Sequence, residues 1–135
     1  MTLGRSTITI LVVEDEVLSR LDLVETLRSA SYEVLEASNA HEALGYLQNG
    51  QRVDVVITDI QLGDDLTGWD VAEKFRAARS DIPIVYTSGS AVDHARKVPC
   101  SVFFGKPLRT ADILRVCREL GYAAGSEPRR AATGS

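Results

Sequence analysis

Acidic residues stand at the ends of two apolar segments of this chain. Asp59 ends the run 53–58, and Glu14 and Asp15 follow the run 8–13. Four of the five residues 53–57 are β-branched and apolar, which is typical of a strand buried on both faces. In a parallel sheet such strands end at the carboxyl edge, where α/β folds place their chemistry. We therefore predict that Asp59 is a nucleophile displayed at that edge.

Three carboxylates brought to one edge would repel one another, and without a cation between them one should take up a proton. An all-oxygen donor set with no His or Cys nearby indicates Mg²⁺. Bridged to a phosphoryl donor, this ion would hold the donor in line with Asp59, which would form an acyl phosphate. Lys106 offers a positive charge to the phosphoryl oxygens, and the Ser88 hydroxyl offers a hydrogen bond.

The segments that must position these residues alternate between strand and helix periods. We expect strands at 8–13, 33–37, 53–58, 84–87 and 101–104. We expect helices at 17–30, 39–49, 67–79 and 110–120. The second of these helices begins with a capping box formed by Asn39 and Glu42. Residues 91–97 can form at most two helical turns before Pro99. This alternation predicts an α/β fold with a doubly wound, five-stranded parallel sheet of flavodoxin-like order 2-1-3-4-5. In that order Glu14, Asp15, Asp59, Ser88 and Lys106 all lie at one rim of the sheet.

The composition fits a single folded domain. The chain has 135 residues, 44% of them hydrophobic and 25% charged, and a net charge of −4. We expect an N-terminal arm at 1–7, one domain at 8–122 and a mobile tail at 123–135. The acidic balance argues against direct nucleic-acid binding or a membrane-surface role. Cys100 and Cys117 lack metal-type spacing, and no signal peptide or membrane-spanning run is found, so a reducing cytoplasm is the expected setting.

The first predicted helix carries more apolar surface than one core-facing stripe needs. Its apolar residues are Val17, Leu18, Leu21, Leu23, Val24 and Leu27. Part of this surface is therefore a candidate for docking a partner. We assign no role to His41 and His94, and we interpret Trp69 as helix packing.

Four motifs occur in a fixed order along the chain: 11–15 (Leu-Val-Val-Glu-Asp), 56–59 (Val-Ile-Thr-Asp), 83–89 (Pro-Ile-Val-Tyr-Thr-Ser-Gly) and 106–107 (Lys-Pro). Each motif is weak alone, but the ordered set over residues 8–120 resembles the receiver domains of two-component response regulators, the CheY-like family. The resemblance implies the same sheet order and a cis Lys106–Pro107 bond.

The resemblance also implies a role for each site residue. The implied roles are Asp59 as phosphoacceptor and Mg²⁺ ligand, Asp15 as direct ligand, Glu14 as ligand through water, the Gln61 backbone carbonyl as a further ligand, Ser88 as switch hydroxyl, Lys106 as phosphate-binding lysine and Phe103 as the aromatic that changes rotamer. The implied partners are a histidine kinase or histidine phosphotransfer protein, a downstream protein target and, in some members, a second copy of the chain. Such a module is not an enzyme beyond catalysing its own phosphorylation and dephosphorylation.

The sequence departs from this family in three places. Leu62-Gly63 stands where Met-Pro is usual, with one extra residue before Gly68. The segment 89–105 is several residues shorter than is typical. We therefore expect a shortened fourth helix at 91–97, before the last strand, and an altered output face. Phe103 replaces the commoner Tyr and removes a hydroxyl from the switch.

Two other functions are compatible with parts of the pattern. A Mg²⁺-dependent phosphohydrolase would also use an aspartyl phosphate, but such enzymes typically carry a second acid two residues after the nucleophile, where this chain has Gln61. A receiver-like scaffold that binds partners without phosphorylation would not need the intact acid set. Within the leading hypothesis, Thr87 is the alternative hydroxyl, and Ser88 is preferred because it leaves the strand last.

Overall fold

The computed structural model describes residues 7–123. Its strands and helices, in chain order, are β1 (Thr9–Val13), α1 (Val17–Ser29), β2 (Glu33–Ala37), α2 (Ala40–Gln48), β3 (Val55–Asp59), α3 (Gly68–Ala78), β4 (Ile84–Ser88), the short 3₁₀ turn η1 (His94–Arg96), β5 (Val102–Gly105) and α4 (Thr110–Ala123). All of the predicted arm except Thr7, and all of the predicted tail except Ala123, lie outside the described residues. Ala123 is the last residue of α4, which runs past its predicted end at 120.

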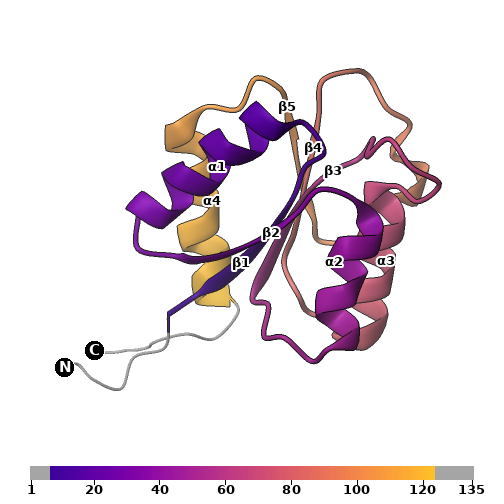
Figure 1. Cartoon of the computed structure of the whole chain (residues 1–135), viewed down its shortest axis with the longest axis horizontal. Helices are drawn as coiled ribbons and strands as arrows, with labels where there is room; N and C mark the ends of the chain where they lie inside the picture. Colours follow the sequence, from indigo (N-terminus) through magenta and orange to yellow (C-terminus); the bar gives the residue numbers. More distant parts are fainter. Residues whose placement is uncertain (1–6, 124–135) are drawn as a thin grey trace.

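The five strands form one parallel sheet of order β2-β1-β3-β4-β5, which confirms the predicted fold class. Helices α1 and α4 cover one face of the sheet, and α2 and α3 cover the other (Figure 1). No helix within residues 7–123 is long and apolar enough to cross a membrane.

Two apolar cores, one on each face, hold the sheet in place. Along β1, Leu11 and Val13 belong to the core under α2 and α3, whereas Ile10 and Val12 belong to the core under α1 and α4. Strands β1, β3 and β4 are buried along their whole length. Each buried Val, Ile or Leu side chain contributes roughly 1.5–3 kcal/mol relative to an exposed one. The carboxyl ends of these central strands are therefore held on a well-packed base.

The structure shifts several predicted boundaries. Strand β3 begins at Val55 rather than at 53, and its last residue is Asp59 itself. Strands β4 and β5 likewise each run one residue further than predicted. Asp54, just before β3, is buried and accepts a hydrogen bond from the Thr9 backbone N–H at 2.8 Å, which ties the starts of β1 and β3 together.

The capping box predicted for α2 is only half formed. The Asn39 side chain accepts from the Glu42 backbone N–H at 2.8 Å, as expected. The Glu42 carboxylate, however, accepts from the backbone N–H of Ser38 at 2.7 Å and from its hydroxyl at 2.9 Å. The prediction was wrong about this return bond, because Ser38 offers two donors one residue earlier. The helix ends as predicted, followed by Gly50 at φ 72°.

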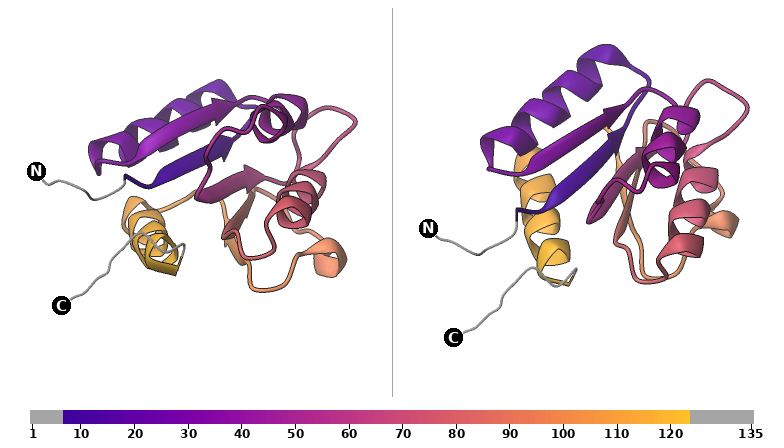
Figure 2. Two further views of the ribbon diagram at one scale, coloured as in Figure 1. Left: turned by 90° about the horizontal axis from the view of Figure 1, so that it is seen from below. Right: turned by 60° about the horizontal axis from the view of Figure 1, so that its bottom comes forward.

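The helix expected between β4 and β5 is shortened, as predicted, because this connection holds only the single turn η1. This turn lies beside α3 (Figure 2). Arg96 attaches it there by hydrogen-bonded ion pairs with Asp70 at 2.8 Å and with Glu73 at 2.7 Å. From the other side, Arg76 of α3 donates to the Pro99 carbonyl at 2.6 Å. The connection is therefore held on α3 by these polar contacts, together with the buried Val98, which belongs to the core under α2 and α3.

Candidate functional site

The sheet register brings the predicted site residues to one edge. Asp59 is the last residue of β3, and Ser88 is the last residue of β4. Glu14 directly follows β1, and Lys106 directly follows β5. The strand pairing continues to these ends, with Asp59 opposite Thr87 and Ser88 opposite Gly105. Four residues far apart in sequence therefore leave the sheet at nearly the same level.

Three carboxylates form a compact acid cluster at this edge. Glu14, Asp15 and Asp59 can each offer an oxygen, and these oxygens lie within 4.8 Å of one another. Glu14 is 4% exposed and Asp59 is 8% exposed, whereas Asp15 faces solvent. Partial burial raises the pKa of Asp15, and the hydrogen bond and negative charge of Glu14 raise it further. The pKa of Asp15 is therefore raised mainly by loss of solvation and to a lesser degree by its acidic neighbour.

Lys106 is the cation within this cluster. Its Nζ donates to Glu14 Oε1 at 2.5 Å and to Asp59 Oδ2 at 3.0 Å. Partial burial alone would lower the pKa of Lys106, but the hydrogen bonds and charges of Glu14 and Asp59 outweigh it and raise the pKa. Lys106 therefore stays charged at neutral pH and links two nearly buried acids.

A magnesium ion fits the donor set. All three acids present carboxylate oxygens, which are the ligands that Mg²⁺ prefers, and the solvent-facing Asp15 leaves room for bound water. A divalent cation would offset the charge of Glu14 beside Asp15, one of the causes that raise the pKa of Asp15. Glu14 has less freedom, because its Oε2 also accepts from the Glu16 backbone N–H at 3.1 Å.

The loop after β3 passes close to Asp15 of the acid cluster. Gly63 has a φ of 72°, and a Cβ at this position would lie 3.1 Å from Asp15 Oδ2. Proline fixes φ near −65°, so the loop follows a path that the family's usual Met-Pro could not take. Leu62 is buried and anchors this path, and Gln61 before it is exposed.

Gly68, at the start of α3, lies against the backbone of Asp59 and Ile60. Its N–H donates to the Ile60 carbonyl at 2.8 Å. A Cβ at this position would lie 2.9 Å from the carbonyl carbon of Asp59 and 2.9 Å from Ile60 Cα, closer than real Cβ atoms approach backbone. A complete capping box between Thr67 and Asp70 then fixes the first turn of α3. This start of α3 supports Asp59 at close range.

Ser88 and Phe103 border a cavity next to Lys106. The cavity has a volume of about 340 Å³, and His94 is also among its lining residues. The Ser88 hydroxyl donates to the Ser90 carbonyl at 2.9 Å and accepts from the Ser90 N–H at 3.2 Å. Ser88 is therefore engaged with the following loop.

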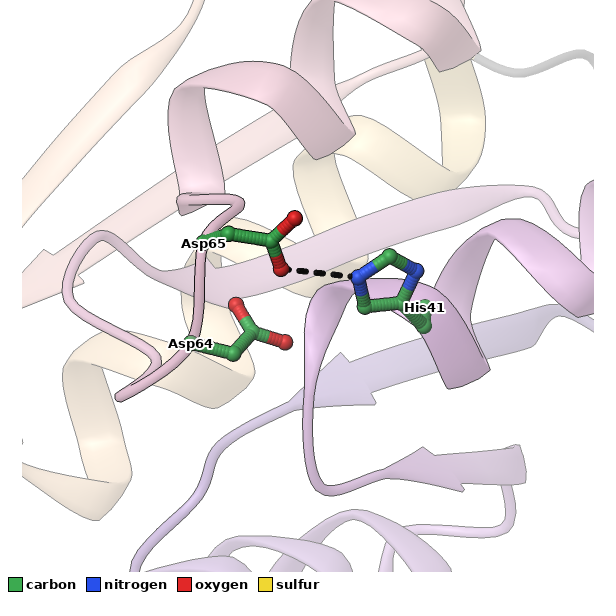
Figure 3. Close-up of side chains that lie close together, drawn as sticks. All are labelled: His41, Asp64 and Asp65. Atoms are coloured by element: carbon green, nitrogen blue, oxygen red, sulfur yellow. Dashed lines mark hydrogen bonds and ion pairs between the residues drawn. The ribbon is translucent and has the colours of Figure 1, made fainter.

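A second group of possible ligands is formed by His41, Asp64 and Asp65 (Figure 3). All three are exposed, and His41 Nε2 lies 3.0 Å from Asp65 Oδ1. The hydrogen bond with Asp65 raises the pKa of His41, and the same bond lowers the pKa of Asp65. His41 lies in the first turn of α2, where the helix dipole opposes a bound cation. We therefore interpret the group as a surface ion pair between α2 and the loop after β3.

Sequence reasoning missed three features around the site. The Thr67-x-x-Asp70 cap has a sequence signature by which it could have been found. Gly68 carries no such signal, because its close approach depends on how α3 meets β3. His94, which had no role assigned from the sequence, packs against Phe103 with ring centroids 4.7 Å apart.

The cis Lys106–Pro107 bond implied by the resemblance is present.

The doubly wound sheet, with an acid cluster and a lysine at its carboxyl edge, is the arrangement that the resemblance to CheY-like receiver domains implied. The model of the response regulator receiver domain family matches residues 10–118. The chain belongs to this family.

Similar proteins agree with this assignment. A response regulator receiver protein from Sinorhizobium medicae superposes with a TM-score of 0.84 at 34% identity, over 89% of this chain and 98% of that one. The regulator TrrA from Thermotoga maritima, solved in complex with Mg²⁺-BeF, gives a TM-score of 0.74 at 26% identity, over 84% of this chain and 99% of that one.

The curated relatives are longer proteins. The sensor kinase CckA of Brucella abortus is 32% identical over 83% of this chain, which spans 12% of that protein. The transcriptional regulatory protein PdtaR of Mycobacterium tuberculosis is 32% identical over 78% of this chain, which spans 52% of that protein.

Proposed function

We propose that this receiver domain takes a phosphoryl group onto Asp59 from the phosphohistidine of a histidine kinase or histidine phosphotransfer protein, and that phosphorylation changes its contacts with a downstream protein. The observation that carries the proposal is the position of Asp59, nearly buried in an acid cluster and bonded to Lys106 Nζ at 3.0 Å. The carboxyl edge of a doubly wound sheet is also where such folds bind their ligands.

The proposed site residues divide the work of binding and transfer. Asp15 and Asp59 would hold Mg²⁺ directly, Glu14 through water, and the Gln61 carbonyl would complete the protein ligands. When bound, the ion supplies positive charge to the phosphoryl oxygens. An Asp59 carboxylate oxygen attacks phosphorus, the P–N bond to the donor histidine breaks, and its electron pair remains on the imidazole. The mixed anhydride on Asp59 is the product.

Lys106 and Ser88 then respond to the new charge. Lys106 can turn one N–H from its carboxylate partners to a phosphoryl oxygen. Ser88 can donate to another phosphoryl oxygen only by giving up its bond to the Ser90 carbonyl. This exchange frees the loop after β4 next to Phe103, so phosphorylation shifts the balance between two arrangements.

An exposed apolar patch on α1 is the proposed docking surface for the phosphodonor. Val17 is 55% exposed, Leu18 72% and Leu21 50%, and they share one side of a helix that begins two residues after Asp15. A donor protein must bring its histidine to Asp59, so it must cover the surface that borders the site. Large exposed apolar side chains at such a place mark a protein contact.

Replacing Leu18 by alanine is expected to slow phosphotransfer from a phosphorylated donor protein roughly five-fold, the effect of losing about 1 kcal/mol at an interface. The reaction of the same variant with acetyl phosphate should keep its wild-type rate, because that small donor needs no docking surface. Label transfer from a phosphohistidine donor, followed over time, measures the first rate, and intact mass after timed incubation with acetyl phosphate measures the second. Equal slowing with both donors would show that the substitution disturbs the site itself.

The acetyl phosphate reaction also tests the proposed function against the phosphohydrolase alternative. A receiver takes up at most one phosphoryl group per chain and releases it slowly, whereas a hydrolase turns over small phosphate esters repeatedly. Gln61, at the position of the second acid, favours the first outcome. Sustained multiple turnover of a small ester by the wild-type chain would refute the receiver function.

A second copy of the chain remains a proposed partner, tested by comparing the mass in solution before and after phosphorylation.

A further inference from the structure

The turn η1 and its neighbours form a connected set of contacts between α3 and the switch residue Phe103. His94 packs on the Phe103 ring at 4.7 Å and meets the Trp69 ring edge-on at 6.5 Å. Trp69 in turn packs on Tyr86 with ring centroids 4.7 Å apart. The imidazole therefore lies between the aromatic ring of the switch and the aromatic rings of the core.

Arg96, two residues after His94, holds this turn on α3. Its guanidinium forms ion pairs with both Asp70 and Glu73 of α3, and about half of the side chain is buried. Asp70 also closes the capping box at the start of α3, directly after the loop that follows Asp59. The turn is thus fastened to the element that supports the nucleophile.

The Ser88 contacts indicate which arrangement the Arg96 ion pairs stabilise. In the structure the Ser88 hydroxyl bonds to Ser90, and residues 89–92 lead directly into Asp93, whose side chain caps η1 by accepting from the Ala95 N–H at 3.0 Å. If Ser88 turns to a phosphoryl group, this short connection must move, and η1 must move with it. In the structure the Arg96 ion pairs occur together with the Ser88–Ser90 bond, the arrangement in which the Ser88 hydroxyl is not free for a phosphoryl group.

We propose that the Arg96 ion pairs to Asp70 and Glu73, acting through His94, hold Phe103 in its unphosphorylated position and so oppose activation. Arg96 and His94 are positioning residues in this role, and the proposal rests on the proposed phosphoacceptor function of Asp59. By reciprocity, a contact that stabilises the unphosphorylated arrangement lowers the affinity for a phosphoryl group or its analogue. Weakening the contact must raise that affinity.

The test is the affinity for beryllofluoride, a phosphoryl analogue, measured by calorimetry with excess Mg²⁺. Arg96→Gln should bind it roughly two- to five-fold more tightly than wild type, the factor that corresponds to an exposed ion-pair network. Arg115→Gln is the matched control, since it removes the exposed α4 ion pair with Asp112. His94→Ala should also bind more tightly, and His41→Ala should match wild type.

A second readout separates this role from a merely structural one. Trp69 is the single tryptophan of the chain, so its emission reports the ring next to His94. Unliganded Arg96→Gln should already show part of the emission change that beryllofluoride causes in wild type. Affinity in Arg96→Gln equal to or weaker than in Arg115→Gln would overturn the inference alone. Failure of the wild type to bind beryllofluoride at all would overturn the phosphoacceptor function and the inference together.

Discussion

Replacing Lys106 by alanine is expected to lower the free energy of unfolding in the absence of divalent cations by about 1–2 kcal/mol. The substitution leaves Glu14 and Asp59, which are 4% and 8% exposed, without the cation that contacts both. Breaking a fully buried pair costs roughly 3–5 kcal/mol, but Asp15 opens this cluster to water, so we expect a smaller loss. Excess Mg²⁺ should restore most of it, because the ion supplies the missing charge.

Urea unfolding with a chelator and with Mg²⁺ measures both parts of this prediction. Lys74→Ala, which removes an exposed lysine of α3, is the control and should change the free energy of unfolding little. The Lys106 variant should still bind Mg²⁺, but the Trp69 emission change on adding beryllofluoride should be strongly reduced. Full activation by this criterion would refute the role of Lys106 in the switch.

Gly68→Ala is expected to lower the free energy of unfolding by about 2–3 kcal/mol, which is the upper part of the range for overpacking. The added Cβ would meet the backbone of Asp59 and Ile60, and backbone cannot rotate away as a flexible side chain can. The hydrogen bond from Gly68 N–H to the Ile60 carbonyl ties the two segments together, so relief of the contact must displace Asp59. The variant should therefore also accept a phosphoryl group more slowly.

Gly45→Ala is the matched control. Gly45 lies inside α2. Apart from its own neighbours in the helix, no atom lies within 4 Å of the place that a Cβ would take there, so alanine should stabilise the chain by about 0.5–1 kcal/mol. Chemical denaturation of the two variants compares them directly. If Gly68→Ala were as stable as Gly45→Ala, the close support of Asp59 by α3 would be wrong.

The sequence was sufficient to predict the fold class and the edge of the sheet at which the site residues lie. Runs such as 55–58 have the composition of buried strands, and the strands of a parallel sheet all have their carboxyl ends at one edge. Together with the expected strand order 2-1-3-4-5, this placed Glu14, Asp59, Ser88 and Lys106 near one another, and the structure has them at that edge.

What could not be predicted depends on contacts between distant segments. The Gly68 approach to Asp59 arises from the docking of α3 on β3, and no local pattern encodes it. The position of His94 against Phe103 depends on the two arginines that hold a short loop on α3. The return bond of Glu42 goes to Ser38 rather than to Asn39, because competing donors one residue apart cannot be ranked from sequence.

The central claim is that Asp59 is the phosphoacceptor, and intact mass after incubation with acetyl phosphate and Mg²⁺ tests it most directly. The wild-type chain should gain the mass of one phosphoryl group, and the gain should disappear when a chelator removes Mg²⁺. Asp59→Asn keeps the size of the side chain but loses the nucleophilic carboxylate, so it should gain nothing. A wild-type chain that binds Mg²⁺ yet is never modified, or an Asp59→Asn chain modified to the same extent as wild type, would contradict the claim.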